Sequence, residues 1–229
     1  MQRVTRRQHT PLWRAGTSNV ITTIIVRPPC AANAMPESRS RSVEHGGDSL
    51  AAEFAAYAQR WPDEAQTAAQ FAALVDDRLD PFVRERLAGH FTASCWLVDR
   101  TGTRVLLTHH RKLQRWLQLG GHADGDRDLP RVALREAQEE SGLHGLRVET
   151  ELFDVDRHWI PERGDVAGHW HYDARYVVHA DAGESFVVSE ESLDLAWRGI
   201  DAIAEDADTD ASLRRMASKW RMRDCTHGD

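Results

Sequence analysis

The chain has 229 residues, 41% of them hydrophobic, so it is long enough to bury a sizeable core. It contains no run of about eighteen apolar residues that could cross a membrane. The formal net charge of −7 disfavours binding to a nucleic-acid polymer, because nonspecific binding of that kind needs a basic surface. Free nucleotides remain candidate partners, since a metal ion can neutralise their phosphates.

The three cysteines, Cys30, Cys95 and Cys225, are odd in number and widely spaced. This pattern fits a reducing compartment and argues against a disulfide framework or a zinc ribbon. We therefore expect a cytoplasmic protein with no membrane partner.

Residues 1–47 differ in composition from the rest of the chain. The first 36 contain five arginines and no acidic residue, and residues 37–47 are rich in Ser, Arg and Gly. We expect a tail that is disordered, or that precedes a true translation start at Met35. A targeting segment is the alternative, but the apolar piece Val20–Val26 is too short and too rich in Thr for a secretory core.

Residues 48–89 are predicted to form a helical extension. Apolar residues recur there at spacings of three and four, and a third short helix is expected to begin at Asp80-Pro81 and end before Gly89. These helices would cover the core, form a homodimer surface or contact substrate. The residues that carry the pattern are Leu50, Phe54, Tyr57, Trp61, Phe71, Leu74, Val75 and Leu79.

From Phe91 onward the apolar period changes to two, which predicts strands. In residues 90–229, which we assign to one domain, strands are expected both before and after a central helix. This order predicts an α/β or α+β fold with a mixed sheet. The expected strands are 91–99, 104–109, 116–119, 146–155, 169–179 and 193–197, with a hairpin turn at Thr101-Gly102 and a last helix at 211–222.

Three glutamates mark the most informative segment. Glu136, Glu139 and Glu140 stand at i, i+3 and i+4, which places their carboxylates on one side of a helix that Asp128 would cap and Gly142 would end. Like charges at this spacing repel, so the cluster indicates a hard cation, Mg²⁺ or Mn²⁺. The alternative is a solvated acidic helix face.

Two features beside the glutamates favour the metal site. Leu119-Gly120-Gly121 allows a sharp turn and lets a backbone carbonyl approach an ion. Arg135 lies four residues before Glu139, a spacing at which it can hold that carboxylate in one rotamer.

Residues 121–143 resemble the Nudix box. Matching positions are Gly121, Arg135, Glu136, Glu139, Glu140, Gly142 and Leu143, with Ala137 as a small version of the aliphatic position. One position departs from the pattern, because Arg127, flanked by Asp126 and Asp128, stands where the family has its first Glu.

The resemblance implies a Nudix-type fold, with a mixed β-sheet sandwiched between helices and here an N-terminal helical extension. It implies that Glu136, Glu139 and Glu140 bind the metal, with Gly121 contributing its carbonyl. It also implies a pyrophosphohydrolase that cleaves the diphosphate linkage of a nucleoside diphosphate-type small molecule. The residues themselves point the same way, because Mg²⁺ held by carboxylates takes substrate phosphate oxygens as further ligands.

A general base is expected outside the helix, because metal occupies the clustered glutamates. Glu190 is the first candidate and Glu191 the second, since their segment follows a long predicted strand. Glu136 is the competing base within the helix, and Arg135 is counted with the catalytic residues.

Histidines supply the candidate substrate contacts. His110 and Arg111 lie at a strand end, where they could bind phosphate or a carboxylate, and His122 follows the glycine turn. His169, His171 and Asp173 alternate along one strand, so their side chains share a face. That face could bind a second metal, contact substrate or form a hydrogen-bonded network.

Two other functions stay open. Gly121-His122 is similar to the glycine-histidine pair of isopentenyl diphosphate isomerases, although residues 115–125 lack a cysteine. A noncatalytic Nudix-like nucleotide sensor is the other, although it would have little need for a self-repelling glutamate cluster.

Overall fold

The computed structural model describes residues 46–189 and 192–224. Its helices are α1 (Gly46–Arg60), α2 (Ala65–Val75), α3 (Leu129–Ser141), α4 (Ile200–Glu205) and α5 (Ala211–Asp224), with a 3₁₀ turn at Pro62–Glu64. Its strands are β1 (His90–Asp99), β2 (Arg104–His110), β3 (Arg115–Leu117), β4 (Leu119–His122), β5 (Arg147–Ile160), β6 (His169–Ala180) and β7 (Ser192–Gly199). The tail expected at 1–47 falls outside the described residues except for its last two, which begin α1. None of the described helices is long and apolar enough to cross a membrane.

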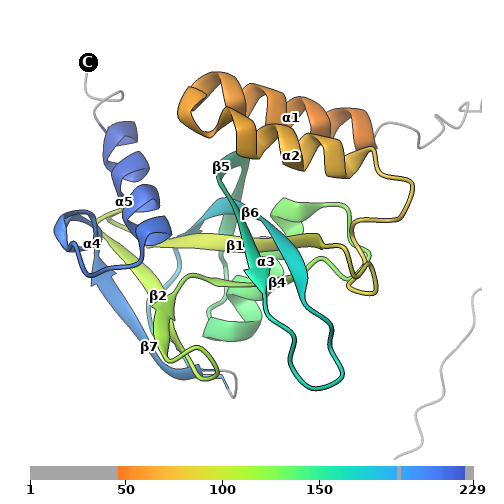
Figure 1. The fold of residues 1–229 in the computed structure, drawn as a ribbon. Helices are drawn as coiled ribbons and strands as arrows, with labels where there is room; N and C mark the ends of the chain where they lie inside the picture. The colour runs from red at the N-terminus through yellow and green to blue at the C-terminus, as the bar shows by residue number, and fades with distance from the viewer. Residues whose placement is uncertain (1–45, 190–191, 225–229) are drawn as a thin grey trace, which may run out of the picture. The chain divides into compact units, whose positions relative to one another are not determined.

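The seven strands form one mixed sheet with the order β3-β2-β1-β6-β5, while β4 pairs with β1 and β7 pairs with β2 (Figure 1). β1 and β6 run parallel over ten residue pairs, and the other pairings are antiparallel. The predicted hairpin joins β1 to β2, with Val98 opposite Val105. β1 therefore lies at the centre of the sheet and carries β4, with its two glycines, on one side and β6 on the other.

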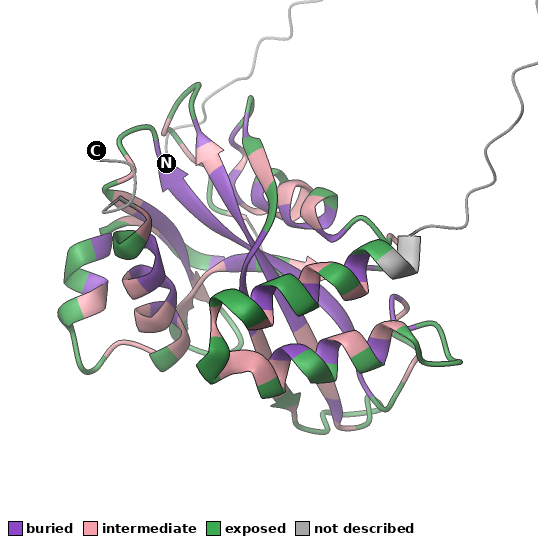
Figure 2. Ribbon diagram, turned by 90° about the horizontal axis from the view of Figure 1, so that it is seen from above, coloured by how far each residue is buried: buried purple, intermediate pink, exposed green. Residues whose placement is uncertain are grey.

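Side chains of β1 alternate between two cores. Phe91, Cys95 and Leu97 pack with residues of α1, α2 and α3, whereas Trp96 and Val98 pack with residues of α4 and α5. The alternation follows from the two-residue period of a strand. Figure 2 shows the resulting buried strands between helices whose outward sides are exposed. The predicted fold class, a mixed sheet sandwiched between helices, is confirmed.

The third predicted helix is wrong. Residues 80–89 form turns instead, because the backbone groups of this segment bond to other partners. The Asp80 carboxylate accepts a hydrogen bond from the Phe82 N–H at 3.1 Å, the Pro81 carbonyl accepts from Phe91 and the Phe82 carbonyl accepts from Gly125. The segment thus connects the helical extension to β1 and to the loop that precedes α3.

A buried ionic network joins α5 to the sheet. Asp154 on β5 has a fully buried side chain and accepts hydrogen bonds from Arg175 (3.1 Å), Arg215 (2.8 Å) and Lys219 (2.6 Å). Burial acts to raise the pKa of Asp154, but the bond from Arg215 and the charges of Arg175 and Lys219 outweigh it and hold the pKa below its usual value. The network places charge on the α5 face of the sheet.

Candidate active site

Helix α3 presents its carboxylates from a well-defined frame. Asp128 caps it by accepting a hydrogen bond from the Arg131 N–H at 3.1 Å, and Gly142 ends it in the left-handed conformation (φ 67°). Ala133 and Ala137 are fully buried against the sheet. These small residues bring the helix close to the strands, and the glutamates lie along its flank.

Glu136 and Glu140 reach back to the two glycines of β4. A Cβ built on Gly121 would lie 2.5 Å from Glu136 Oε2, so only glycine leaves room for this carboxylate above the strand. The Gly120 N–H donates a hydrogen bond to Glu140 Oε1 at 2.8 Å. Glu139 is exposed, whereas Glu136 and Glu140 are half-buried.

These residues fit a hard divalent cation. The sharp turn expected at Leu119-Gly120-Gly121 is wrong, because both glycines lie in the extended strand β4 and pair with Ser94 and Ala93 of β1. The donors are carboxylate oxygens gathered beside this strand, and the Glu136 carboxylate fills the space that a side chain at position 121 would take. Glu136 and Glu140 lie against β4 and Glu139 is the exposed member, which leaves one side of the site accessible to substrate.

Arg135 differs from its prediction. Its Nη2 donates to Glu136 Oε1 and to the His122 carbonyl, both at 2.9 Å, rather than holding Glu139. The guanidinium turns toward β4, where a carbonyl and a carboxylate lie together, whereas Glu139 points to solvent. Arg135 thereby fixes Glu136 and the end of β4 in one arrangement.

Arg127, at the position that departs from the family pattern, lies against the 80–89 segment. It pairs with Asp80 (3.2 Å) and its guanidinium stands 4.7 Å from the centre of the Phe82 ring. Asp126 bonds to Arg131 through both carboxylate oxygens, at 2.6 and 3.0 Å. The flanking Asp128 is the helix cap, so all three residues have structural contacts at the start of α3.

The candidate bases Glu190 and Glu191 lie outside the described residues. Their described neighbours connect two parts of the site region. The Val187 N–H donates to the Ser141 carbonyl at the end of α3 (2.8 Å), and Ser192 pairs with His110 on β2. The position of either glutamate stays a prediction.

His110 and Arg111 lie at the β2–β3 turn. His110 Nδ1 accepts a hydrogen bond from the Lys112 N–H (3.1 Å), and Arg111 donates to the Ser192 carbonyl (3.0 Å). Both contacts hold the turn and the start of β7. Their predicted role in substrate binding stays a prediction.

The His-x-His-x-Asp segment divides into two environments. His169 and His171 lie together, with Nε2 atoms 3.1 Å apart. Asp173, however, accepts hydrogen bonds from Thr92 (3.0 Å) and Ser94 (2.7 Å) and pairs with Arg175. A second metal site composed of His169, His171 and Asp173 is therefore wrong, because the carboxylate serves a buried polar network.

Two residues that lie near the predicted ones were not expected from the sequence. His90 lies beside His122 and His171, which the sequence could not indicate because the parallel pairing of β1 with β6 is a long-range feature. Arg84 bonds to Asp124 (2.7 and 2.5 Å). Burial, followed by the charge of Arg84, lowers the pKa of His122 to about 4.

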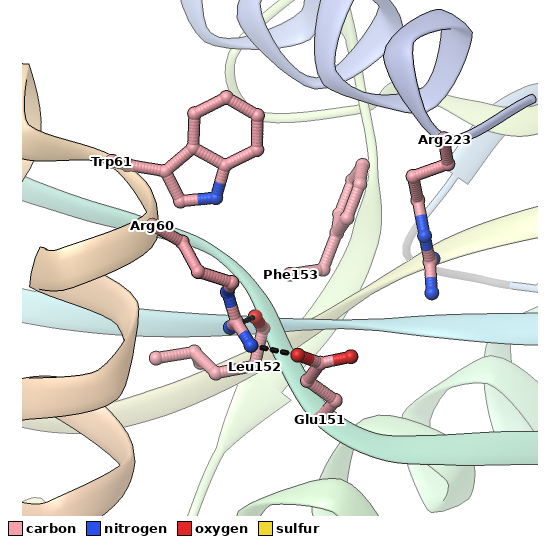
Figure 3. Close-up of a pocket in the computed structure, with 6 residues that line it drawn as sticks. All are labelled: Arg60, Trp61, Glu151, Leu152, Phe153 and Arg223. Carbon is pink, nitrogen blue, oxygen red and sulfur yellow. Dashed lines mark hydrogen bonds and ion pairs between the residues drawn. The ribbon is translucent and has the colours of Figure 1, made fainter. Parts of the chain in front are cut away.

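Two further features do not contribute to the glutamate site. Cys95 is completely buried, and burial, aided by the charges of Glu140 and Glu136, raises the pKa of its thiol. A hollow of about 110 Å³ lies between α1, β5 and α5 and is lined by Arg60, Trp61, Glu151, Leu152, Phe153 and Arg223 (Figure 3). Its lining includes no residue of the 121–143 motif, and Arg60 pairs with Glu151 within it.

Several solved structures resemble this chain. An Ap4A hydrolase from C. elegans, in a binary complex, is 16% identical, with a TM-score of 0.48 over 59% of this chain and 98% of that one. A MutT protein from Methanosarcina mazei Go1 is 15% identical, with a TM-score of 0.47 over 61% and 97%. The E. coli dihydroneopterin triphosphate pyrophosphohydrolase is 17% identical, with a TM-score of 0.46 over 58% and 95%.

No curated protein matches the chain significantly. A family model does: the NUDIX domain matches residues 89–219, more than half of the chain, and spans the sheet, α3 with its glutamates, and most of α5. The prediction from the 121–143 motif is thereby confirmed, and so is the expected class of enzyme, a pyrophosphohydrolase. The chain belongs to the NUDIX domain family.

Proposed function

We propose that this enzyme hydrolyses the diphosphate linkage of a nucleoside diphosphate-type small molecule with the help of Mg²⁺ or Mn²⁺. The observation that carries the proposal is the approach of Glu136 and Glu140 to Gly120 and Gly121 of β4, because this gathers carboxylate oxygens beside the backbone of a strand that carries no side chain there. Glu136, Glu139 and Glu140, with the Gly121 carbonyl, would hold the ion. When bound, it neutralises charge on a diphosphate and lowers the pKa of an attacking water.

The protein's own groups have separate roles in this proposal. Arg135 positions Glu136 through the bond at 2.9 Å. Arg84, whose side chain is half exposed, would contact substrate phosphate, since a forked guanidinium suits that geometry. Glu190 or Glu191 would accept the proton from water, with Glu136 as the competing base.

The alternative functions have weaker support. An isomerase of the isopentenyl diphosphate type would need a reactive thiol, and Cys95 is completely buried with a raised pKa. A noncatalytic sensor would leave unexplained why three acidic side chains are kept together on one helix beside the glycines of β4.

The test is a hydrolysis screen of the purified protein against a panel of diphosphates: nucleoside diphosphate sugars, dinucleotides, ADP-ribose-type compounds and isopentenyl diphosphate. Each compound is assayed with Mg²⁺, with Mn²⁺ and with excess chelator. We expect release of phosphate-containing products from a nucleoside diphosphate derivative, with loss of turnover in chelator. Isomerisation without hydrolysis, or nucleotide binding without turnover for every compound, would identify one of the other two functions instead.

A further inference from the structure

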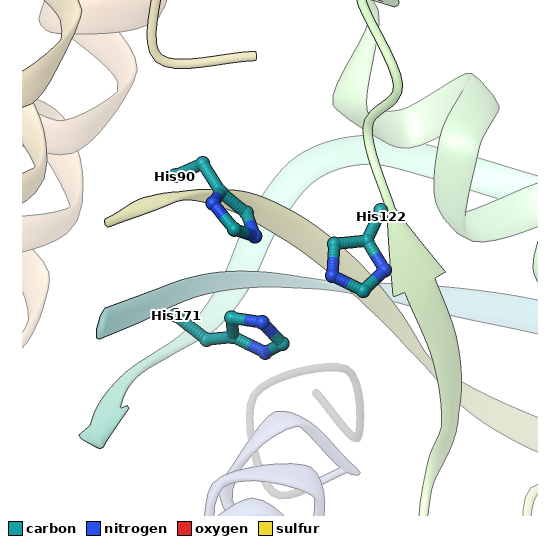
Figure 4. A group of neighbouring side chains, drawn as sticks. All are labelled: His90, His122 and His171. Carbon is teal, nitrogen blue, oxygen red and sulfur yellow. The ribbon is translucent and has the colours of Figure 1, made fainter. Parts of the chain in front are cut away.

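Three histidines from three neighbouring strands meet on the sheet face opposite the glutamates. His90 begins β1 and pairs with His171 on β6, while His122 ends β4 and pairs with Thr92. One nitrogen from each of the three rings lies within 4.8 Å of the other two. The ring centres are 4.9–5.2 Å apart, and Figure 4 shows the rings turned toward one another. Strands hold all three residues, so little movement is needed to bring the nitrogens onto one ion.

His90 provides the independent sign of a ligand. His90 is only 2% exposed, and its Nδ1 lies 3.3 Å from the Arg86 carbonyl oxygen. Nδ1 must carry the proton in that contact, which leaves a lone pair on Nε2. Nε2 is buried and has no hydrogen-bond partner among the described residues. A buried polar atom of this kind is costly unless a partner satisfies it, and a metal ion would do so.

His171 has a second polar neighbour, His169, which decides which ring nitrogen of His171 carries the proton. His169 Nδ1 lies 2.8 Å from the Ala167 carbonyl, so it is the protonated nitrogen and Nε2 carries the lone pair. That Nε2 is 3.1 Å from His171 Nε2. Since His169 Nε2 carries a lone pair, the proton in this contact lies on His171 Nε2, which leaves Nδ1 of His171 with the lone pair that an ion would need.

We propose that His90, His122 and His171 bind a divalent transition-metal ion of the Zn²⁺ type. Three imidazoles match the preference of Zn²⁺ for nitrogen, and Zn–N bonds of about 2.0–2.1 Å would place the ligand nitrogens about 3.3 Å apart, a modest contraction from their present spacing. His122 and His171 are partly exposed, so a further coordination position faces solvent and would take water or an anionic oxygen. The ion differs from the hard cation proposed for the glutamates.

The two sites are physically connected. Gly121 and His122 are adjacent in β4, so successive residues face opposite sides of the sheet. The same Arg135 nitrogen bonds both the His122 carbonyl and Glu136 (2.9 Å each). An ion on the histidines would therefore fix the strand that also carries the Gly121 carbonyl.

The test uses the full chain after treatment with chelator and dialysis. Zn²⁺ binding is followed by calorimetry and Co²⁺ binding by visible absorption. Four-coordinate Co²⁺ absorbs visible light far more strongly than the six-coordinate hydrated ion, so the spectrum reports binding to protein ligands. We expect about one equivalent of Zn²⁺ at this site and clear visible Co²⁺ bands. His122→Gln and His171→Gln should each lower Zn²⁺ affinity about 100-fold or more and abolish the Co²⁺ bands.

Two controls make the result specific. His144→Gln alters an exposed histidine on the loop after α3 and should bind Zn²⁺ as the wild type does. The double variant Glu139→Gln, Glu140→Gln should also keep the Zn²⁺ site, which separates this proposal from the proposed hydrolysis. Unchanged affinity in both histidine variants, loss of Zn²⁺ in the glutamate variant, or a wild-type Co²⁺ spectrum like that of the hydrated ion would each overturn the proposal.

Discussion

The two faces of β4 carry different chemistry, although one peptide bond separates Gly121 from His122. On the α3 face, carboxylates come from one helix at positions three and four apart, and the nearby glycines admit them. On the other face, imidazoles come from three strands and lie partly buried. Local spacing thus builds the first site and long-range strand pairing builds the second, so the two should respond differently to substitution.

The largest expected effect lies on the histidine-bearing face, in the ionic network that holds α5. Asp154→Asn should lower the free energy of unfolding by about 3–5 kcal/mol, because it removes the fully buried carboxylate that Arg175, Arg215 and Lys219 share and leaves an excess of positive charge there. Chemical denaturation of both proteins at neutral pH measures the difference. Asp181→Asn, which breaks an exposed pair with Arg147, is the control and should cost less than about 1 kcal/mol.

The same network should give a pH dependence. The pKa of Asp154 is lower in the folded than in the unfolded protein, so its stabilisation is complete above the usual carboxyl pKa of about 3.9 and declines as the pH falls below it. The stability gap between wild type and Asp154→Asn should therefore narrow on acidification. A gap of equal size at pH 7 and at strongly acidic pH would show that the charge of Asp154 is not the cause.

On the glutamate face, substitutions should affect turnover and leave stability unchanged. Glu139→Gln and Glu140→Gln each remove charge from the proposed metal site without adding bulk, and each should lower turnover about 100-fold or more. Steady-state kinetics at saturating Mg²⁺ measures the turnover of each variant against wild type, and the melting temperature checks that each variant is folded. Near-wild-type turnover in either folded variant would exclude that glutamate from the site.

The identity of the general base gives a second test of the proposed hydrolysis. If Glu190 or Glu191 accepts the proton, its change to Gln should lower turnover about 100-fold with metal affinity retained. The base would lie in α3 if Glu190→Gln and Glu191→Gln both keep turnover within a few fold of wild type while Glu136→Gln loses turnover at unchanged metal affinity.

A smaller effect is expected at the boundary between the faces. Gly121→Ala would place its Cβ against the Glu136 carboxylate, which can rotate away because it is the end of a flexible side chain. We expect turnover to fall about tenfold with little loss of stability. Gly183→Ala is the matched control, since nothing lies within 4 Å of its added Cβ. An equal loss of turnover in Gly121→Ala and Gly183→Ala would show that turnover does not depend on the room that Gly121 leaves for the Glu136 carboxylate.

The smallest effect is expected at Arg127. Its contacts with Asp80 and Phe82 lie at the start of α3, so Arg127→Glu should change turnover only a few fold. Asp126→Asn should cost more, because Asp126 bonds Arg131 through both oxygens and accepts the Asp128 N–H. The reverse order in parallel kinetic measurements would indicate that Arg127 contacts substrate phosphate.

Sequence patterns predicted the parts of this protein that depend on local spacing. The i, i+3, i+4 glutamates, the Asp128 cap and the alternation in β1 and β6 all follow from neighbouring residues, whereas the turn expected at Gly120-Gly121 was wrong because pairing with β1 holds these glycines in a strand. The role of His90 could not be predicted, because it depends on the parallel pairing that brings residues 90 and 171 together. The prediction of a helix at 80–89 was wrong because tertiary hydrogen bonds replaced helical ones. The prediction that Arg135 holds Glu139 was wrong because the His122 carbonyl on β4 accepts a hydrogen bond from Arg135 instead.

The most direct measurement is a Mn²⁺ titration followed by electron paramagnetic resonance, with and without one equivalent of Zn²⁺ already bound. Opposite faces with different donors predict that Zn²⁺ on the histidines leaves Mn²⁺ binding in place, and that Glu139→Gln with Glu140→Gln removes the bound Mn²⁺ signal while Zn²⁺ stays. Displacement of Mn²⁺ by the first equivalent of Zn²⁺ would mean that the two ions share one site and would contradict the account.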